Sequence, residues 1–224
     1  MVQRRDVLKA SLCWLPAAGV GPAIAQTGAD ALDLLAQFMR QVRSGRAQFV
    51  QVVTSASRQG QPPRSKTSSG TLEFQRPGRL RLVYRKPFEQ TLVADGQTLW
   101  LHDPDLNQVT ARRQSQVLGN TPAALLTSAA DLQGLQADFQ LRAEANRDGL
   151  QWVRATPKAA DGQIQQALLG LRQTDKGPEL VVIDVLDGLG QRSVLTFSAL
   201  DINPSLAPDT FVFRPPAGAD LMRP

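Results

Sequence analysis

The sequence contains very few of the side chains that metal centres and nucleophilic enzymes use. Its 224 residues include one cysteine, Cys13, and one histidine, His102. Zinc sites and Cys–His catalytic pairs draw their groups from these two residue types, so both are nearly excluded. The chain also has no G-x-x-x-x-G-K phosphate loop and no G-x-S-x-G nucleophile turn. The sequence therefore predicts no catalytic residue, no metal and no cofactor.

His102 is the one residue on which a hydrolase interpretation can rest. It precedes Asp103 at the end of a predicted strand, but a catalytic His–Asp pair also needs a nucleophile, and no motif supplies one. We expect His102 to be a surface strand residue. Asp103 and Asp105 flank a proline and are typical of a turn, with too few ligands for Ca²⁺. The hydrolase alternative predicts a polar cavity around His102.

Aromatic residues and long charged runs are also scarce. Aromatics make up 5% of the chain, which is too few for a protein that stacks on nucleic-acid bases, so no nucleic-acid partner is expected. The net charge is +5, yet no five like charges follow one another. The basic clusters at 79–86 and 112–113 are read as solvated strand faces, or alternatively as a surface that attracts an acidic partner.

The N-terminus reads as an export signal. Arg4, Arg5 and Lys9 precede a mostly apolar stretch over 10–24 that is too short to span a bilayer. Ala23-Ile24-Ala25 has the small-x-small form of a cleavage site. The twin arginines leave both general secretory and twin-arginine export open. We therefore expect residues 1–25 to be a cleaved signal peptide and residues 26–224 to form a single domain.

Cys13 lies inside this predicted signal. A lipid-modified cysteine normally follows a small residue, whereas Cys13 follows Leu12, so we favour a removed residue over a lipid anchor. The predicted mature chain then has no cysteine and no disulfide, although export would permit one.

Two helices are predicted. The apolar residues between Ala31 and Val42 follow helical spacing, with Asp30 as the N-cap and Ser44-Gly45 as the end. A second, short helix is expected over Pro122–Ser128, where Asn120-Thr121 precedes a proline in the first turn.

Almost everything else reads as strands. Alternating segments are expected at 47–53, 71–76, 79–85, 90–94, 97–102, 108–113, 137–143, 150–156, 163–172, 179–186 and 192–200. A polar loop is expected over Gly60–Ser69. Asp-Gly turns at 95, 148, 161 and 187 join neighbouring segments and indicate an antiparallel meander. The best architecture is a strongly curved antiparallel sheet, wet on one face, with two or three helices over one opening.

Arg76 is a charged residue at a position where the alternation predicts an apolar one. Alternation places it on the apolar face with Leu72 and Phe74, at the end of a strand and next to Pro77. A buried guanidinium needs acceptors such as helix-end carbonyl oxygens. The pattern leaves two interpretations open: an arginine that extends to water, or one that holds a helix.

Several segments, taken in order, resemble the bacterial periplasmic outer-membrane lipoprotein carrier family. The matching motifs, in register over about 180 residues, are A-Q-F-V-Q at 47–51, S-G-T-L-E-F-Q-R-P-G-R-L-R at 69–81, D-G-Q-T-L-W-L-H-D-P at 95–104 with N-Q-V-T at 107–110, G-N-T-P at 119–122, and F-V-F-R-P-P-A-G at 211–218. Together, behind an export signal, they are specific to that family.

The resemblance implies an unclosed β-barrel with a helical lid over a hydrophobic cavity. It implies a soluble, monomeric, non-enzymatic chaperone of the periplasm. Its partners would be acylated lipoprotein cargo, an inner-membrane lipoprotein-releasing ABC transporter and an outer-membrane receptor lipoprotein. The family's lid-latching arginine falls on Arg76, which favours the helix-holding interpretation.

The predicted acyl-chain cavity combines the apolar sheet face with the two helices. Its expected members are Leu34, Leu35, Phe38, Leu72, Phe74, Leu80, Leu82, Tyr84, Leu99, Leu101, Leu125 and Leu126. Two alternatives remain besides the hydrolase: a carrier or sensor for another envelope lipid on the same fold, and a structural adaptor with a filled core.

Overall fold

The computed structural model describes residues 29–57, 62–117, 124–127, 131–159 and 164–223. Within these ranges the helices are α1 (Ala29–Gln41), α2 (Gln114–Val117), α3 (Ala124–Thr127) and α4 (Leu132–Asp138). The strands are β1 (Ser44–Thr54), β2 (Ser65–Gln75), β3 (Arg79–Lys86), β4 (Gln90–Asp95), β5 (Thr98–Asp103), β6 (Gln108–Arg113), β7 (Phe139–Arg147), β8 (Leu150–Pro157), β9 (Ile164–Thr174), β10 (Gly177–Asp187), β11 (Arg192–Ile202) and β12 (Asp220–Met222). The predicted signal peptide lies outside the described residues.

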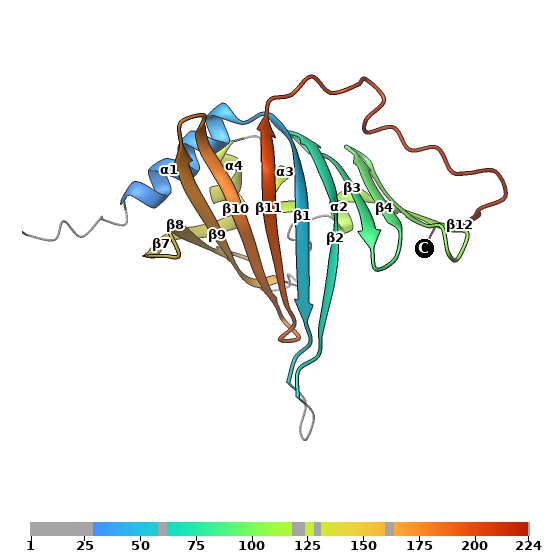
Figure 1. The fold of residues 1–224 in the computed structure, drawn as a ribbon, viewed down its shortest axis with the longest axis horizontal. Coiled ribbons are helices and arrows are strands. Elements are labelled where there is room, and N and C mark those ends of the chain that lie inside the picture. The colour runs from blue at the N-terminus through green and yellow to red at the C-terminus, as the bar shows by residue number, and fades with distance from the viewer. Residues whose placement is uncertain (1–28, 58–61, 118–123, 128–130, 160–163, 224) are drawn as a thin grey trace, which may run out of the picture.

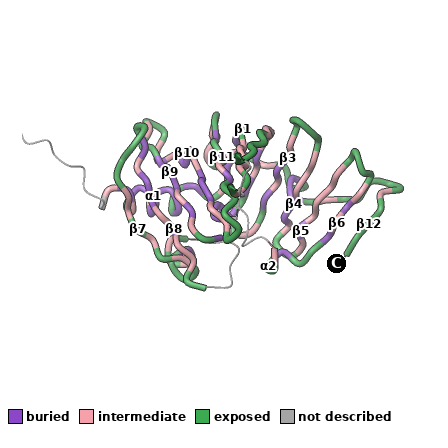
Figure 2. Tube along the Cα trace, turned by 90° about the horizontal axis from the view of Figure 1, so that it is seen from below, coloured by how far each residue is buried: buried purple, intermediate pink, exposed green. Residues whose placement is uncertain are grey.

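The strands form one open sheet in the order β12-β6-β5-β4-β3-β2-β1-β11-β10-β9-β8-β7. Antiparallel pairing of β1 with β11 joins the two meanders, and the edge strands β7 and β12 lie at opposite ends of the molecule (Figure 2). The sheet does not close on itself, which confirms the expected unclosed, mainly antiparallel architecture.

Tight turns connect most neighbouring strands, as the Asp-Gly pairs predict. The pair at 95 joins β4 to β5, the pair at 148 joins β7 to β8, and the pair at 187 joins β10 to β11. Gly96 and Gly149 have φ values of 105° and 71°, a backbone region that side chains with a Cβ rarely adopt. The pair at 161 lies outside the described residues.

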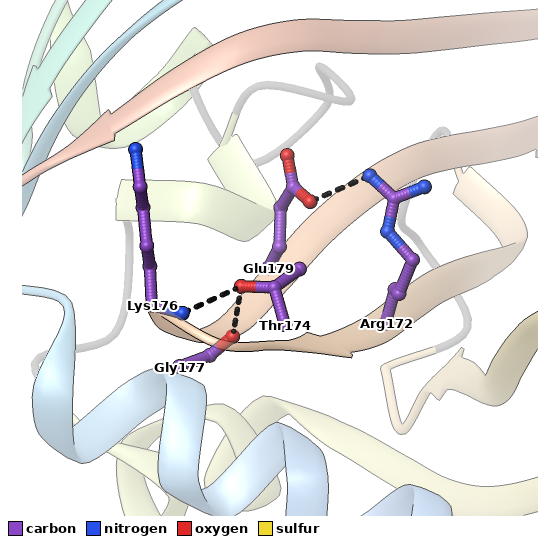
Figure 3. A network of polar contacts seen from close by, with 5 residues as sticks. All are labelled: Arg172, Thr174, Lys176, Gly177 and Glu179. Carbon is purple, nitrogen blue, oxygen red and sulfur yellow. Dashed lines mark hydrogen bonds and ion pairs between the residues drawn. The ribbon is translucent and has the colours of Figure 1, made fainter.

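The turn between β9 and β10 carries a small polar network, whose side chains extend to the side of the hairpin away from α1 (Figure 3). Thr174 Oγ1 donates to the carbonyl oxygen of Gly177 over 2.8 Å and accepts from the backbone N–H of Lys176 over 3.2 Å. Arg172 and Glu179, which pair across the two strands, form an ion pair of 2.7 Å. These contacts fix a hairpin that packs beside α1.

The helices lie on the concave face of the sheet (Figure 1). Helix α1 contacts β7, β8, β9, β10 and α4, whereas α3 contacts β2. The buried face of α1 and the inner faces of the strands form one hydrophobic cluster, the core cluster, which contains Phe38, Leu72 and Leu195. Since α1 is amphipathic, burial of one face against the sheet fixes its position.

The structure corrects several sequence-based boundaries. Asp30 lies within the first turn of α1 and is not its N-cap. Residues 65–69, expected to be loop, belong to β2 because they pair with β1 from Ser65 onward. Helices α2 and α4 and strand β12 were not predicted, and residues 137–138, expected to be strand, end α4. Of the predicted helix at 122–128, the described part is α3.

The convex face is also more covered than expected. The C-terminal segment after β11 crosses it, and Phe213 lies with its ring centroid 5.5 Å from that of Trp100. Val93 and Val109, which face the same side, are fully buried. The expectation of a sheet wet on one face is therefore wrong for β4–β6, because the chain's own C-terminal segment covers those strands.

Candidate functional site

Arg76 lies directly after β2 and its side chain reaches back under two helices. Its Nε donates to the carbonyl oxygen of Leu126 over 2.6 Å, and its Nη1 donates to the carbonyl oxygens of Val42 and Met39 over 2.7 and 3.3 Å. The last carbonyl oxygens of a helix receive no hydrogen bond from within the helix. A cationic donor at this end supplies those hydrogen bonds and also interacts favourably with the helix dipole. One guanidinium thus joins α1 to α3.

The guanidinium is buried among aromatic rings. Arg76 is 7% exposed, with its Cζ 4.9 Å from the ring centroid of Phe38 and 5.7 Å from that of Phe74. Burial, together with the nearby charge of Arg43, lowers the pKa of Arg76 to about 10. This value keeps the side chain charged at neutral pH. The guanidinium does not extend to water but lies against carbonyl oxygens at the ends of α1 and α3.

The turn that carries Arg76 is itself fixed by backbone contacts to the helices. The backbone N–H of Gly78 donates to the carbonyl oxygen of Thr127 over 2.8 Å, and that of Arg76 donates to the carbonyl oxygen of Arg43 over 2.9 Å. Buried Gln114 donates to the carbonyl oxygen of Gly78 over 2.7 Å. The arginine is therefore held at its backbone as well as at its side chain.

A second polar contact anchors the end of α1. Asn203 Oδ1 accepts from the backbone N–H groups of Arg43 and Ser44 over 2.7 and 3.1 Å, and its Nδ2 donates to the carbonyl oxygen of Gln41 over 2.8 Å. Sequence reasoning missed both Gln114 and Asn203. Each acts through a partner far away in the chain, and local pattern carries no signal of such pairing.

The predicted cavity residues come together beneath the helices. Ten of them are buried members of the core cluster: Leu34, Leu35, Phe38, Leu72, Phe74, Leu80, Leu82, Leu99, Leu125 and Leu126. Tyr84 is partly buried and packs against the cluster. Leu101 is half-buried at its margin and is not part of the cluster. In this closed arrangement the apolar helix faces and the apolar sheet face cover each other.

The other half of the sheet contributes equally to this interior but was not included in the predicted site. Its buried members in the cluster are Val153, Ala155, Ile164, Ala167, Leu169, Leu171, Leu180, Ile183, Val185, Leu195 and Phe197. The signal for them was present, because Leu169 and Leu171 alternate in the way expected of one strand face. Only the pairing of β1 with β11 places that face beside the predicted one.

A pocket of about 700 Å³ adjoins the core cluster at the end of the concave face that α1 does not contact; we call it the mouth pocket. It is lined by Gln51, Val53, Ser55, Arg64, Lys66, Ser68, Tyr84, Pro87, Phe88, Glu89, Gln90, Asp103, Asp105, Leu106 and Gln191. Tyr84 is shared between the pocket and the predicted cavity. Its ring meets that of Phe49 edge to face at 5.0 Å, and burial raises its pKa to about 12.

His102 lies on the opposite, convex face. Its ring centroid is 5.9 Å from that of Phe213, on the surface that the C-terminal segment crosses. Asp103 accepts the backbone N–H of Leu106 over 3.2 Å and so acts as a turn residue. In the described ranges, three or more His, Cys, Asp or Glu side chains nowhere gather as they would around a metal ion. None of the described helices is both long and apolar enough to cross a bilayer.

Comparison with known proteins gives consistent matches over most of the chain. Residues 40–214 match the family model described as Outer membrane lipoprotein carrier protein LolA. A protein of Albidiferax ferrireducens named Outer-membrane lipoprotein carrier protein is 57% identical over 196 residues, covering 88% of this chain and 92% of the relative. One of the same name from Methylibium petroleiphilum is 46% identical over 209 residues, covering 93% of this chain and 96% of the relative.

A solved structure shares the fold at much lower sequence identity. An uncharacterized conserved protein from Thermus thermophilus superimposes with a TM-score of 0.51 at 13% identity, covering 89% of this chain and 100% of that protein. At this identity the likeness concerns the fold alone.

Proposed function

The chain belongs to the outer-membrane lipoprotein carrier protein family, and on that premise we propose that it carries acylated lipoproteins through the periplasm. Each exposed methylene of an acyl chain costs about 0.8 kcal/mol in water. A cargo with several acyl chains is therefore opposed by on the order of tens of kcal/mol if it crosses water uncovered. A carrier removes that cost by covering the chains.

The observation that carries this proposal is the apolar concave face roofed by helices that Arg76 holds through their carbonyl oxygens. The described polar contacts of α1 with Arg76 and Asn203 lie at its C-terminal end, whereas the apolar side chains of the helices cover the surface that an acyl chain would use. Lid and lipid therefore compete for one surface. Cargo binding displaces the helices, and closure of the helices expels the cargo.

Arg76 sets the balance between these two states. In the closed state it contributes hydrogen bonds from a charged donor, each worth about 1.5–3 kcal/mol. Opening separates the guanidinium from at least one helix and breaks hydrogen bonds. Because the guanidinium is then exposed to water, new hydrogen bonds to water offset part of the lost free energy. The carrier is thereby kept closed when empty, yet opens when acyl chains supply enough apolar contact.

The remaining features follow the same proposal. Residues 1–25 are removed on export, and residues 26–224 act as one domain in the periplasm. An inner-membrane lipoprotein-releasing ABC transporter supplies the cargo, and an outer-membrane receptor lipoprotein accepts it. The chain acts by binding and release, without catalysis or cofactor.

A release assay tests the proposal. Inner-membrane vesicles that contain the transporter and a labelled lipoprotein are incubated with ATP and the mature chain, and then sedimented. We expect the label in the supernatant, bound to the chain and absent when the chain or ATP is omitted. If the label stays in the pellet while an established family member releases it, the proposal fails. Mass spectrometry of the released complex separates lipoprotein from another envelope lipid.

A further inference from the structure

The concave face changes from apolar to polar, row by row, along the strands. Paired residues of adjacent strands form one row across the sheet, and the row of Ala47, Leu72, Leu82, Leu92 and Leu101 is entirely apolar. Rows such as this one supply the surface that we propose for acyl chains.

The next rows are different. Phe49 pairs with Gly70, Gly70 with Tyr84, and Tyr84 with Gln90. Tyr84 donates its hydroxyl to Gln51 Oε1 over 2.8 Å, and Gln51 Nε2 donates to Ser193 Oγ over 2.8 Å. This chain of hydrogen bonds is the boundary between the core cluster and the mouth pocket. Beyond it, in the mouth pocket, polar and charged side chains such as Arg64, Lys66 and Glu89 lie among the apolar residues Val53, Pro87, Phe88 and Leu106.

The mouth pocket is lined by side chains of both charges. The positive charges are Arg64, just before β2, and Lys66, within it; Lys66 Nζ lies 5.2 Å from the ring centroid of Phe88. The negative charges are Glu89, between β3 and β4, Asp103, at the end of β5, and Asp105, in the turn after β5. The pocket therefore offers hydrogen-bond donors and acceptors at the same time.

Resting on the proposed carrier function, we propose that the mouth pocket holds the polar peptide segment that follows the acylated residue of the cargo. A peptide backbone presents one N–H donor and one C=O acceptor per residue, which mixed walls satisfy whatever the side chains are. A volume of about 700 Å³ lies in the range of sites that hold a small ligand. Acyl chains lie beyond Tyr84, and the peptide leaves through the pocket to the water.

Other occupants fit the pocket less well. An acyl chain could contact Val53, Phe88 and Leu106, but it offers no hydrogen bond to the charged side chains of the lining and would displace water from them, which is unfavourable. A phospholipid phosphate would be attracted by Arg64 and Lys66, but the carboxylates of Glu89, Asp103 and Asp105 in the same lining repel it.

Disulfide trapping tests the inference, because Cys13 is the only cysteine of the chain and lies ahead of the predicted mature start. Ser68→Cys introduces a thiol in the mouth pocket, and Ser198→Cys, on the convex face opposite Gln48, is the matched control. The probe is a triacylated test lipoprotein whose second cysteine lies either early in its linker or within its folded reporter domain. Soluble complexes of the full chain are collected after export and treated with diamide.

We expect Ser68→Cys to cross-link to the linker cysteine at least about fivefold more than Ser198→Cys does, because a bound linker holds the two thiols at high effective concentration. Equal yields from the two variants, or equal yields with the reporter-domain cysteine, would overturn the inference. The inference would also be overturned if phosphatidylglycerol vesicles, without any cargo, protected the Ser68→Cys thiol from reaction with maleimide. If the cargo is carried without this cross-link, only the inference fails. If the wild-type chain carries no cargo, the proposed function fails with it.

Discussion

The guanidinium of Arg76 donates to the main-chain carbonyl oxygen of Val42 over 2.7 Å, although 34 positions separate the two residues in the chain. Through this bond the turn after β2 holds the C-terminal end of α1, and the bond from the same side chain to Leu126 holds α3. One side chain therefore contacts both helices, and these contacts are the basis of the latch that we propose. The first prediction follows from that arrangement.

Replacing Arg76 with leucine should leave the chain folded but slow the release of cargo. Arg76→Leu removes the charged hydrogen bonds that favour the closed, empty state, at about 1.5–3 kcal/mol each. A change of about 1.4 kcal/mol is tenfold in an equilibrium, so transfer to outer-membrane vesicles should slow roughly tenfold or more. Arg46→Leu, which removes a half-exposed arginine paired with Glu73, is the control. Transfer of the Arg76→Leu complex at the wild-type rate would contradict the latch.

Truncation of Phe74 should destabilise the chain far more than truncation of Phe88. Phe74 is 1% exposed within the core cluster, so Phe74→Ala should lower the free energy of unfolding by about 3–5 kcal/mol. Phe88 is 61% exposed at the mouth pocket, so Phe88→Ala should change it by less than about 0.5 kcal/mol. Urea unfolding followed by circular dichroism measures both. Similar losses for the two variants would show that the core is not where we place it.

Gly70 should not tolerate even a methyl group. A Cβ at this position would lie 1.9 Å from the carbonyl oxygen of Val83, where β2 and β3 shift register. Because backbone and not a flexible side chain blocks the space, Gly70→Ala should cost about 1–3 kcal/mol, the range of overpacked sites. Ser68→Ala, in the same strand, serves as the comparison in thermal unfolding. A Gly70→Ala chain as stable as Ser68→Ala would mean that the two strands pair in another register.

Asp95 should contribute stability that acid removes. Although burial alone raises its pKa, the net pKa of Asp95 is lowered by hydrogen bonds from the backbone N–H groups of Thr98 and Gln97 and from the indole N–H of Trp100. A carboxyl with a lower pKa in the folded state stabilises the fold above its unfolded pKa. This stabilisation is lost as the pH falls through the folded pKa.

Asp95→Asn should therefore be less stable than the wild type at pH 7, and the gap should shrink below about pH 3.8, the ordinary value for this group. The measurement is the free energy of unfolding in urea at both pH values. Asp105→Asn, in the exposed turn after β5, should change it by less than about 0.5 kcal/mol at either pH. If the difference in unfolding free energy between Asp95→Asn and the wild type stayed constant down to acid pH, the predicted pH dependence of the Asp95 contribution would be excluded.

The sequence by itself determined the strand faces, most turns and the apolar side of α1. Alternation and helical spacing are local, since they depend on which neighbours share a face, and ten of the twelve expected cavity residues lie together for that reason. The order of the sequence motifs was also enough to identify the family. The start of β2 was missed because Ser, Lys and Thr at 65–69 form a strand only through their pairing with β1.

Only the tertiary structure decided how these parts meet. Pairing of β1 with β11 joins the two halves of the apolar face, and the C-terminal segment covers Trp100 on the other side. The carbonyl oxygens that receive the Arg76 donors come from two helices remote in sequence. A local pattern records that a charge must be satisfied, but not which distant backbone group satisfies it, because that choice depends on the free energy of the whole fold.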